Sequence, residues 1–233
     1  MRFRTSLLSI FFLSSLACGG SVYQPSRLAH FEPDGSAEVN DEDVRKAFEA
    51  KSQLGEQLNV AYFTFDPSKE ADIEKAIRAV PGVSSVYSIP ALAVTGQHRF
   101  DDTPSWQAPA PAPVSIKQLR LLAARAHCDV LVVVDYSHRT DVSVNAFVAL
   151  DVLLVPTLFV PFLDMKVQSA VDAFVLDTRN GYMYGHVALT KEDRAPRQNI
   201  YDTDAELVQT QWTALEVELQ DALVKLADAE RKH

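Results

Sequence analysis

The sequence predicts an α/β fold with a mixed, α+β type of sheet, whose two halves are organised differently. The first half alternates strand, helix, strand, helix, strand, an order that implies a partly parallel sheet with right-handed crossovers. The second half places two strands around an Asn-Gly pair and ends in one long helix. Asn-Gly between such strands is the strongest short hairpin signal, so we expect an antiparallel hairpin there.

The elements of the first half begin with a short helix at residues 43–50 and a strand at residues 58–65. The strand is expected because its residues alternate in hydropathy and are rich in aromatic and β-branched types. A helix then opens at Ser68, stops at Pro81-Gly82, and is followed by a second strand at residues 83–89. One face of that helix carries its apolar residues: Ile73, Ala76, Ile77 and Val80.

The middle of the chain is expected to contain a long loop, a helix and a central strand. Residues 96–113 are rich in Pro and Ala without periodicity, which indicates the loop. Ser115 and Gln118 have the spacing of a capping box, in which each side chain satisfies a backbone donor near the other. The apolar stripe of the helix is Ile116, Leu119, Ala123 and Ala126. The almost unbroken apolar run at 128–134 is typical of a strand covered on both faces.

The hairpin strands of the second half are expected at residues 171–177 and 182–189. Asp177 precedes the turn, where its carboxylate can accept hydrogen bonds from nearby backbone N–H groups. The final helix, residues 204–232, has one narrow apolar seam: Val208, Trp212, Leu215, Leu219, Ala222 and Leu226. We expect this seam to pack on the sheet of its own chain; a coiled-coil or oligomer contact is the alternative.

Residues 146–163 form a nearly continuous apolar segment. Asp151, Pro156 and Pro161 interrupt it, which argues against a regular membrane-spanning helix. The interpretation we favour is a buried strand, a turn and a second strand or loop. The alternative is a hairpin that leaves the domain and meets a membrane or a partner, because apolar surface of that size is rarely left exposed.

The N-terminus has the layout of a bacterial secretory signal, with Arg2 and Arg4 before a short apolar run. The run ends in Leu-Ala-Cys at Cys18, which resembles the lipobox of bacterial lipoproteins, although Ser15 stands where Leu is usual. This resemblance implies cleavage before Cys18, a diacylglycerol on its thiol and an acyl chain on its amine. We therefore expect a signal peptide at 1–17, a flexible tether at 18–42 and one α/β domain at 43–233. Gly19, rather than Asp, follows the Cys, which by the same resemblance implies the outer membrane, with the periplasmic side favoured.

The composition excludes several function classes. The formal net charge of −9 disfavours nucleic acid and anionic lipid surfaces as partners. No two histidines, and no histidine and acid, have metal-ligand spacing, and the catalytic and phosphate-binding motifs are missing, so no metal, cofactor or enzymatic activity is expected. Once Cys18 is lipidated, Cys128 is the one remaining thiol, which precludes an intramolecular disulfide; we expect Cys128 to be buried and inert.

The candidate contact site consists of Asp135, Tyr136, His138 and Asp141. These residues follow the central strand directly, and ligands of open α/β sheets bind near that end. The hypothesis is that they contact a ligand or a partner. If the protein were an enzyme, they would instead be the acid and base groups of an envelope hydrolase.

Taken with the lipobox, several segments resemble the rhombotarget lipoprotein family. The matching segments are Ser26-Arg27-Leu28 to Pro33, Val60 to Phe65, Val83 to Pro90, Asp129 to Tyr136, and Val171 to Asp177 with its hairpin. The resemblance implies a lipoprotein of poorly defined function in bacteria that carry a rhomboid-type sorting protease, rhombosortase. The chain ends in a polar helix and lacks the Gly-Gly, apolar and basic tail of that protease's substrates. The order of elements also resembles the α/β domains of envelope assembly lipoproteins, including the curli secretion lipoprotein.

The sequence therefore predicts a non-enzymatic outer-membrane lipoprotein whose domain binds another envelope protein during assembly or sorting. The alternative is an oligomeric secretion channel in which residues 146–163 form a membrane-inserting hairpin. The envelope hydrolase is the second alternative.

Overall fold

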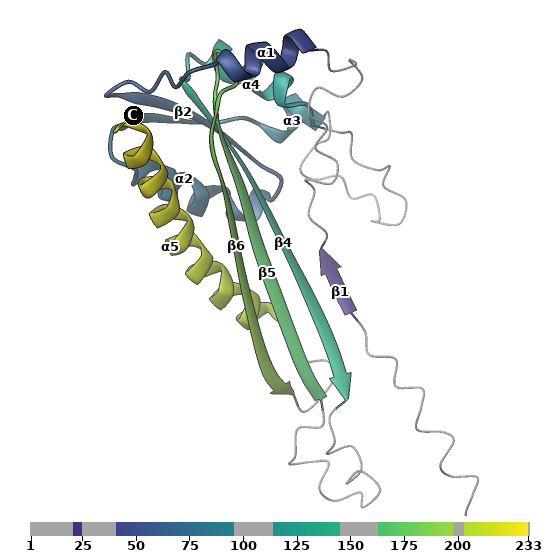
Figure 1. Ribbon diagram of the computed structural model, residues 1–233. Coiled ribbons are helices and arrows are strands. Elements are labelled where there is room, and N and C mark those ends of the chain that lie inside the picture. The colour runs from purple at the N-terminus through teal and green to yellow at the C-terminus, as the bar shows by residue number, and fades with distance from the viewer. Residues whose placement is uncertain (1–20, 25–40, 96–113, 145–162, 198–202, 233) are drawn as a thin grey trace, which may run out of the picture.

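The computed structural model describes residues 21–24, 41–95, 114–144, 163–197 and 203–232. Its strands form one mixed sheet in the order β3-β2-β4-β5-β6, with β1 paired to β4 beside this path (Figure 1). The strands are β1 (Ser21–Gln24), β2 (Leu58–Thr64), β3 (Val83–Ser88), β4 (Val130–Val144), β5 (Leu163–Asp177) and β6 (Met183–Arg197). β2 is parallel to β3 and to β4, whereas β4, β5 and β6 are antiparallel. The predicted mixed sheet with an antiparallel hairpin is confirmed.

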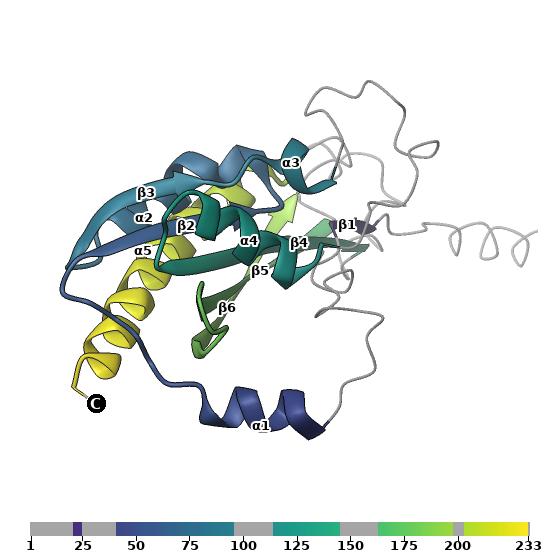
Figure 2. The same ribbon diagram turned by 90° about the horizontal axis from the view of Figure 1, so that it is seen from above.

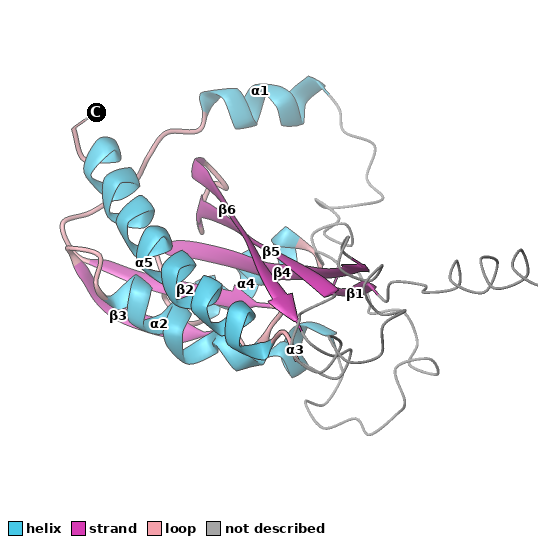
Figure 3. Ribbon diagram, turned by 90° about the horizontal axis from the view of Figure 1, so that it is seen from below, coloured by secondary structure: helices cyan, strands magenta, loops and turns pink. Residues whose placement is uncertain are grey.

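The helices are α1 (Asp41–Glu49), α2 (Glu70–Arg78), α3 (Ala91–Thr95), α4 (Ile116–Arg125) and α5 (Ala205–Glu230), with a short 3-10 turn, η3 (Pro67–Lys69), before α2. α2 and α5 contact each other and lie on one face of the sheet (Figure 3). α4 packs on the opposite face of β2 and β4. In the described part of the chain, none of the helices is both long and apolar enough to cross a bilayer.

The head of the molecule is the region in which the sheet is covered on both sides. β4 alternates between two cores there: Val130, Val132 and Val134 face α5, and Leu131 and Val133 face α4. Both sets are at most 4 % exposed, which is why this part of the strand is continuously apolar. The predicted two-sided burial of the central strand is confirmed.

The strands β4, β5 and β6 run well beyond the head as a three-stranded ribbon, which is the lower part of Figure 1. Each of the three has 15 residues, and β4 stays paired with β5 from Val130–Asp177 to Val144–Leu163. The sequence predicted shorter strands at these positions, and these predicted lengths were wrong. Beyond the head, β5 alternates between buried residues on the α5 side and half-buried or exposed residues on the other side.

Local backbone chemistry marks the start and end of the helical segment that contains α2. Asp66 caps the 3-10 turn η3 that precedes α2, because Asp66 Oδ1 accepts a hydrogen bond from Ser68 N at 2.9 Å, whereas α2 itself begins at Glu70 without a side-chain cap. Ile73, Ala76 and Ile77 are buried, as the apolar face predicted. Gly82 follows with φ +85°, a conformation that favours glycine, before β3 begins.

The predicted capping box of α4 is wrong. Ser115 does occupy the N-cap position, with φ −83° and ψ 127°, but its side chain makes no capping hydrogen bond. Gln118 Nε2 instead donates to the carbonyl oxygen of Ala93 at 3.4 Å.

The long helix α5 lies against β5, β6 and α2 through its apolar seam. Trp212, Leu215 and Leu219 of the predicted seam are at most 1 % exposed. Val208, Ala222 and Leu226 are only partly buried, whereas Gln211, Leu223 and Ala227 complete the buried stripe. The stripe shifts because 3.6 residues per turn rotate the contact line along so long a helix. Packing on its own sheet is confirmed.

Two N-terminal elements differ in how they relate to the sheet. β1 lies within residues 18–42, which the sequence assigned to a flexible tether; at residues 21–24 that prediction is wrong, because the segment pairs with β4. α1 confirms the expected short helix and stands apart from the sheet (Figure 2). Its Phe48 is 89 % exposed. The other predicted tether residues, the 96–113 loop, the apolar segment up to residue 162 and Cys18 lie outside the described residues.

We predict that Leu219→Ala lowers the free energy of unfolding by about 2–5 kcal/mol, because it leaves a cavity where α5 meets the sheet. Val217→Ala on the same helix is the matched control. Val217 is 57 % exposed, so its truncation is expected to change stability by no more than about 0.5 kcal/mol. Urea unfolding of both variants gives the measurement, and equal effects would contradict this packing of α5.

Candidate functional site

The four residues predicted as a contact site all lie on β4, but on opposite faces of it. Side chains of a strand alternate, so Tyr136 and His138 project toward α5, while Asp135 and Asp141 project to the other face. Tyr136 packs edge-on against Trp212 of α5, with ring centroids 5.1 Å apart. The prediction of one cluster beyond the strand end is wrong, because the strand continues through these residues. The split also separates the groups that an acid–base pair would need.

On the α5 side, Tyr136 belongs to a buried chain of hydrogen bonds. Ser169 Oγ donates to Gln211 Oε1 at 2.6 Å, and Tyr136 Oη lies 3.3 Å from Ser169 Oγ. Because the single Ser169 hydroxyl hydrogen points to Gln211, Tyr136 is the donor in its own bond. Gln211 Nε2 then donates to the carbonyl oxygen of Val167 and to Asp193 Oδ2, both at 2.9 Å. All the polar atoms of the Gln211 side chain are therefore used to join α5 to the ribbon.

A buried lysine lies next to this chain. The Lys69 ammonium is 4.8 Å from the Trp212 ring centroid and 5.5 Å from that of Tyr136, and Lys69 is only 8 % exposed. Such cation–π contacts stabilise a desolvated cation. Trp212 Nε1 in turn donates to Asp72 Oδ2 at 2.6 Å, which fixes the indole.

These surroundings make Tyr136 and its neighbours structural rather than reactive. Burial raises the pKa of the Tyr136 hydroxyl, with its bond to Ser169 acting in the opposite direction and the charges of Asp66 and Asp204 adding to the rise. The phenol therefore stays protonated at neutral pH. The neighbouring His138 has a buried Nδ1 without a hydrogen-bond partner among the described residues, and its ring centroid is 5.9 Å from that of Tyr136.

The opposite face of the ribbon, which we call the open face, carries the other two predicted residues. Asp135, next to the head, is buried there at 2 % exposure, whereas Asp141 is half-buried. Its polar side chains form pairs across or along the strands. Arg139 Nε lies 3.0 Å from Asp141 Oδ1, and Lys166 Nζ lies 3.0 Å from Glu192 Oε2. The hydrogen bond from Lys166, helped by Arg194, lowers the pKa of the Glu192 carboxyl despite partial desolvation.

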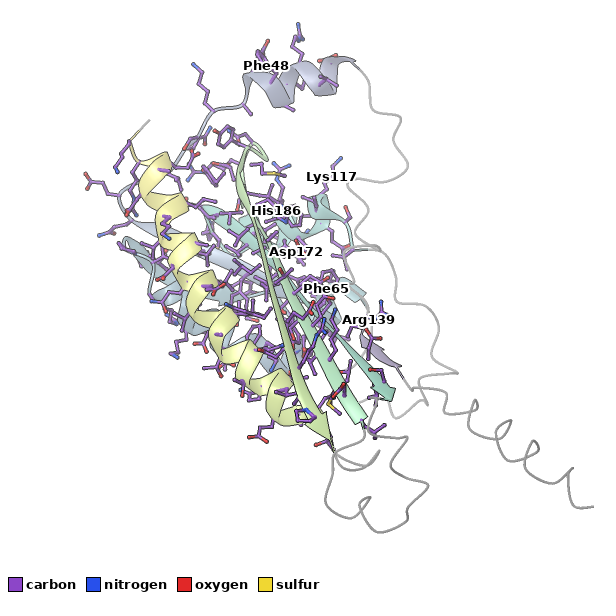
Figure 4. The ribbon with its side chains drawn as sticks, turned by 60° about the horizontal axis from the view of Figure 1, so that its bottom comes forward. Phe48, Phe65, Lys117, Arg139, Asp172 and His186 are labelled. Atoms are coloured by element: carbon purple, nitrogen blue, oxygen red, sulfur yellow. The ribbon has the colours of Figure 1, made fainter. Side chains whose placement is uncertain are left out.

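Nearer the head, the open face contains a histidine that the sequence analysis did not single out. His186 Nε2 is 2.9 Å from Asp172 Oδ1, and the His186 ring stacks on Phe174 with centroids 4.3 Å apart. Figure 4 labels Asp172, His186 and Arg139 on the ribbon. In the described residues no hydroxyl or thiol is hydrogen-bonded to His186, so this pair lacks the nucleophile of a catalytic triad. The hairpin predicted from the sequence could have found this pair, because its strands align Phe174 with His186.

The remaining residues considered from the sequence have structural positions. Asp177 Oδ1 accepts from Arg179 N and Asn180 N at 2.8 and 3.1 Å, which confirms its predicted role in the turn. Gly181 follows with φ +74°, as the Asn-Gly hairpin requires. Cys128 is 6 % exposed, and burial raises the pKa of its thiol, in accord with an inert cysteine. Within the described ranges, no group of three or more His, Cys, Asp or Glu side chains is arranged to hold a metal.

A groove lies at the head, at the opposite end from the ribbon tip. It has a volume of about 860 Å³ and is open to solvent. Its lining comes from the segment after α1, from Tyr182 and from the C-terminal end of α5, where Arg231 donates to the carbonyl oxygen of Pro81 at 2.6 Å. Neither the open face nor this groove brings together groups that suggest a particular reaction.

No family model matches the chain, and a search of curated proteins finds no match. Among solved structures, the chain is similar to the lipoprotein GNA1162 from Neisseria meningitidis, with 11 % sequence identity and a TM-score of 0.29. The similarity covers 70 % of this chain and 96 % of that one. A likeness at this level assigns neither a family nor a function.

We predict that Gln211→Ala destabilises the fold by about 2 kcal/mol or more, because it leaves buried groups of Ser169 and Val167 without their partner. Gln209→Ala is the matched control on the same helix, since exposed Gln209 makes only a 3.5 Å contact with Lys69. Urea unfolding should separate the two variants clearly. Equal stability of both would show that the buried chain of hydrogen bonds does not hold α5 on the ribbon.

A second prediction concerns alkaline pH and Tyr184. Its hydroxyl donates to Asp177 Oδ2 at 2.7 Å, and burial, followed by this bond, raises its pKa well above the ordinary value. The unfolded chain releases this proton near about pH 10, whereas the folded chain retains it, so stability is complete below about pH 10 and falls as the pH rises above it. Tyr184→Phe should make that fall less steep.

At pH 7 the same Tyr184→Phe substitution should cost about 1–3 kcal/mol, because Asp177 loses a donor in a buried position. Tyr87→Phe, at a position 43 % exposed, should change stability at pH 7 by no more than about 0.5 kcal/mol. Urea unfolding between about pH 7 and pH 11 checks both statements. An unchanged alkaline slope in Tyr184→Phe would rule out this tyrosine as a source of the pH dependence.

Proposed function

We propose that this chain is a lipoprotein anchored through Cys18 in the outer membrane of a Gram-negative bacterium, and that its domain binds another envelope protein without catalysing a reaction. The lipobox at Cys18 supports the anchor, and the rhombotarget resemblance supports an envelope protein of the assembly or sorting kind. The observation that carries the binding role is the open face of the ribbon.

The open face is extensive. Three 15-residue strands at about 3.3 Å per residue span roughly 45 Å from the hairpin turn in the head to the ribbon end. α5 packs on one side of it, and the polar side chains of the other side point away from α5. Members of this face that are exposed or half-exposed include Arg139, Asp141, Lys166, Gln168, Asp172, His186, Ala188, Thr190, Glu192 and Arg194.

The charge of the open face favours a protein as its partner. Arg139, Lys166 and Arg194 are balanced by neighbouring acids, so the face has no excess of positive charge. Nucleic acid or an anionic lipid surface would require such an excess. Mixed polar pairs around a small apolar centre, here Phe174 beneath His186, are instead what protein interfaces commonly contain.

The internal use of the buried polar groups supports a role in binding rather than catalysis. Tyr136, Ser169 and Gln211 satisfy one another beneath α5. Asp177 is occupied by the hairpin turn and by Tyr184. Groups held in this way stabilise the scaffold that presents the open face.

The proposal predicts that a photo-crosslinking amino acid at Ala188 or Thr190 captures a specific envelope protein in intact cells. Both positions are exposed on β6, and the same amino acid at Val217 or Asp221 on α5 provides the control. The binding role requires that Glu192→Lys, which breaks the pairs with Lys166 and Arg194, abolish the adduct, and that Asp221→Lys leave it intact. Adducts of equal yield from both faces, or adducts indifferent to Glu192→Lys, would refute it.

The anchor has its own test, which is mass spectrometry of the mature N-terminus. We expect a chain that begins at Cys18 and carries the mass of a diacylglycerol and an amide-linked acyl chain. Cys18→Ala should leave the protein unlipidated and release it from the membrane fraction, because two or more acyl chains are what hold such a protein stably.

A further inference from the structure

The pairing of β1 with β4 fixes the direction from which the chain arrives at the domain. Ser21 lies opposite Asp141 and Gln24 lies opposite His138, in antiparallel register. β4 runs toward its end at Val144 and β1 runs in the opposite direction, so the first residue of β1, Ser21, is the one nearer to that end. In Figure 1, β1 lies beside the distal half of β4, far from the helices of the head.

The distance from β1 to the proposed anchor is short. Cys18 precedes Ser21 by three residues, and a fully extended chain covers at most about 3.3–3.6 Å per residue, or roughly 10 Å. Val144 lies three residues beyond Asp141 along β4, which is also roughly 10 Å. A lipid on Cys18 could therefore lie no farther from Ser21 than roughly 10 Å, which is about the distance from Asp141 to the ribbon end.

We propose that β1 holds the ribbon end-on to the membrane, with the end formed by Val144 and Leu163 facing the bilayer and the head directed away from it. This inference rests on the proposed lipidation of Cys18 and names the bilayer as the partner of this end. The hairpin turn at Asn180, which lies at the other end of the ribbon, is then roughly 45 Å from the lipid.

The pairing of β1 shortens the stretch of chain between the anchor and the domain. With β1 paired, Ser21 stands three positions after the anchor. Without that pairing, the next described element is α1, about 23 residues from Cys18, and a flexible chain of that length would have a root-mean-square span of roughly 26 Å. The domain would then turn freely above the membrane, and its two ends would approach the lipid equally often.

The test uses the full-length lipidated protein in phosphatidylcholine–phosphatidylglycerol vesicles that contain a nitroxide-labelled lipid. A fluorescent amino acid replaces Ser143 near the ribbon end, Thr190 in the middle, or Met183 at the head, all of which are exposed. The nitroxide quenches fluorescence only over a short range. We therefore expect strong quenching of the fluorescent amino acid at position 143, weaker quenching at 190 and no quenching at 183. Equal quenching, or more at 183 than at 143, would overturn the proposed orientation.

The role of β1 is tested by Val22→Pro combined with Tyr23→Pro, which removes ladder donors from the strand. The gradient between positions 143 and 183 should disappear in this variant. Ser26→Pro combined with Arg27→Pro adds the same two prolines outside β1 and should retain the gradient. A gradient that survives the prolines in β1 would show that β1 does not set the orientation.

The failure of the anchor and the failure of the orientation give different results. Mass spectrometry decides whether Cys18 carries lipid, independently of quenching. If it does not, the same labelled chains with Cys128→Ala are coupled through Cys18 to a maleimide lipid in the vesicles. The gradient from 143 to 183 is then still required, and its absence counts against the orientation alone.

Discussion

The structure depends on β4, because the backbone N–H and C=O groups along both of its edges require hydrogen-bond partners. One edge is paired with β5 over all 15 residues. The other is paired with β2 at residues 130–134 and then with β1 at residues 138–141. An open edge of that length would invite pairing with other chains. A segment of only four residues from near the N-terminus therefore completes the sheet where β2 stops.

The change from two-sided to one-sided burial along β4 explains the positions of the polar residues. Up to Val134, helices cover both faces and almost every side chain is apolar. Beyond Val134, α5 covers one face, and the polar groups on that face, Tyr136, Ser169 and Gln211, are buried and mutually satisfied. Such a chain of hydrogen bonds specifies how α5 sits on the ribbon, because a shift of the helix would leave several buried groups unpaired.

The sequence was a good guide where one physical pattern dominated. The apolar run of β4, the Asn-Gly hairpin with Asp177, and Trp212, Leu215 and Leu219 of α5 were all predictable, because periodicity and turn chemistry are local signals. The distal ribbon was not predictable in this way. A strand with one solvated face, such as residues 135–144, has the composition of a loop, and β1 is too short to give any periodic signal. The clustering expected of the candidate site was wrong for another reason, since its four residues are adjacent in sequence but divided between the two faces of β4.

The same division separates the residues that stabilise the fold from those of the proposed contact surface. Side chains on the α5 face of the ribbon are committed to the fold, so changing them costs stability. Side chains on the open face form exposed ion pairs, which contribute little to stability, typically below about 1 kcal/mol each. The identity of those charges is therefore hardly constrained by folding. A surface of this kind can change in sequence to suit a partner while the strands that present it, and the direction in which they extend from the proposed anchor, stay the same.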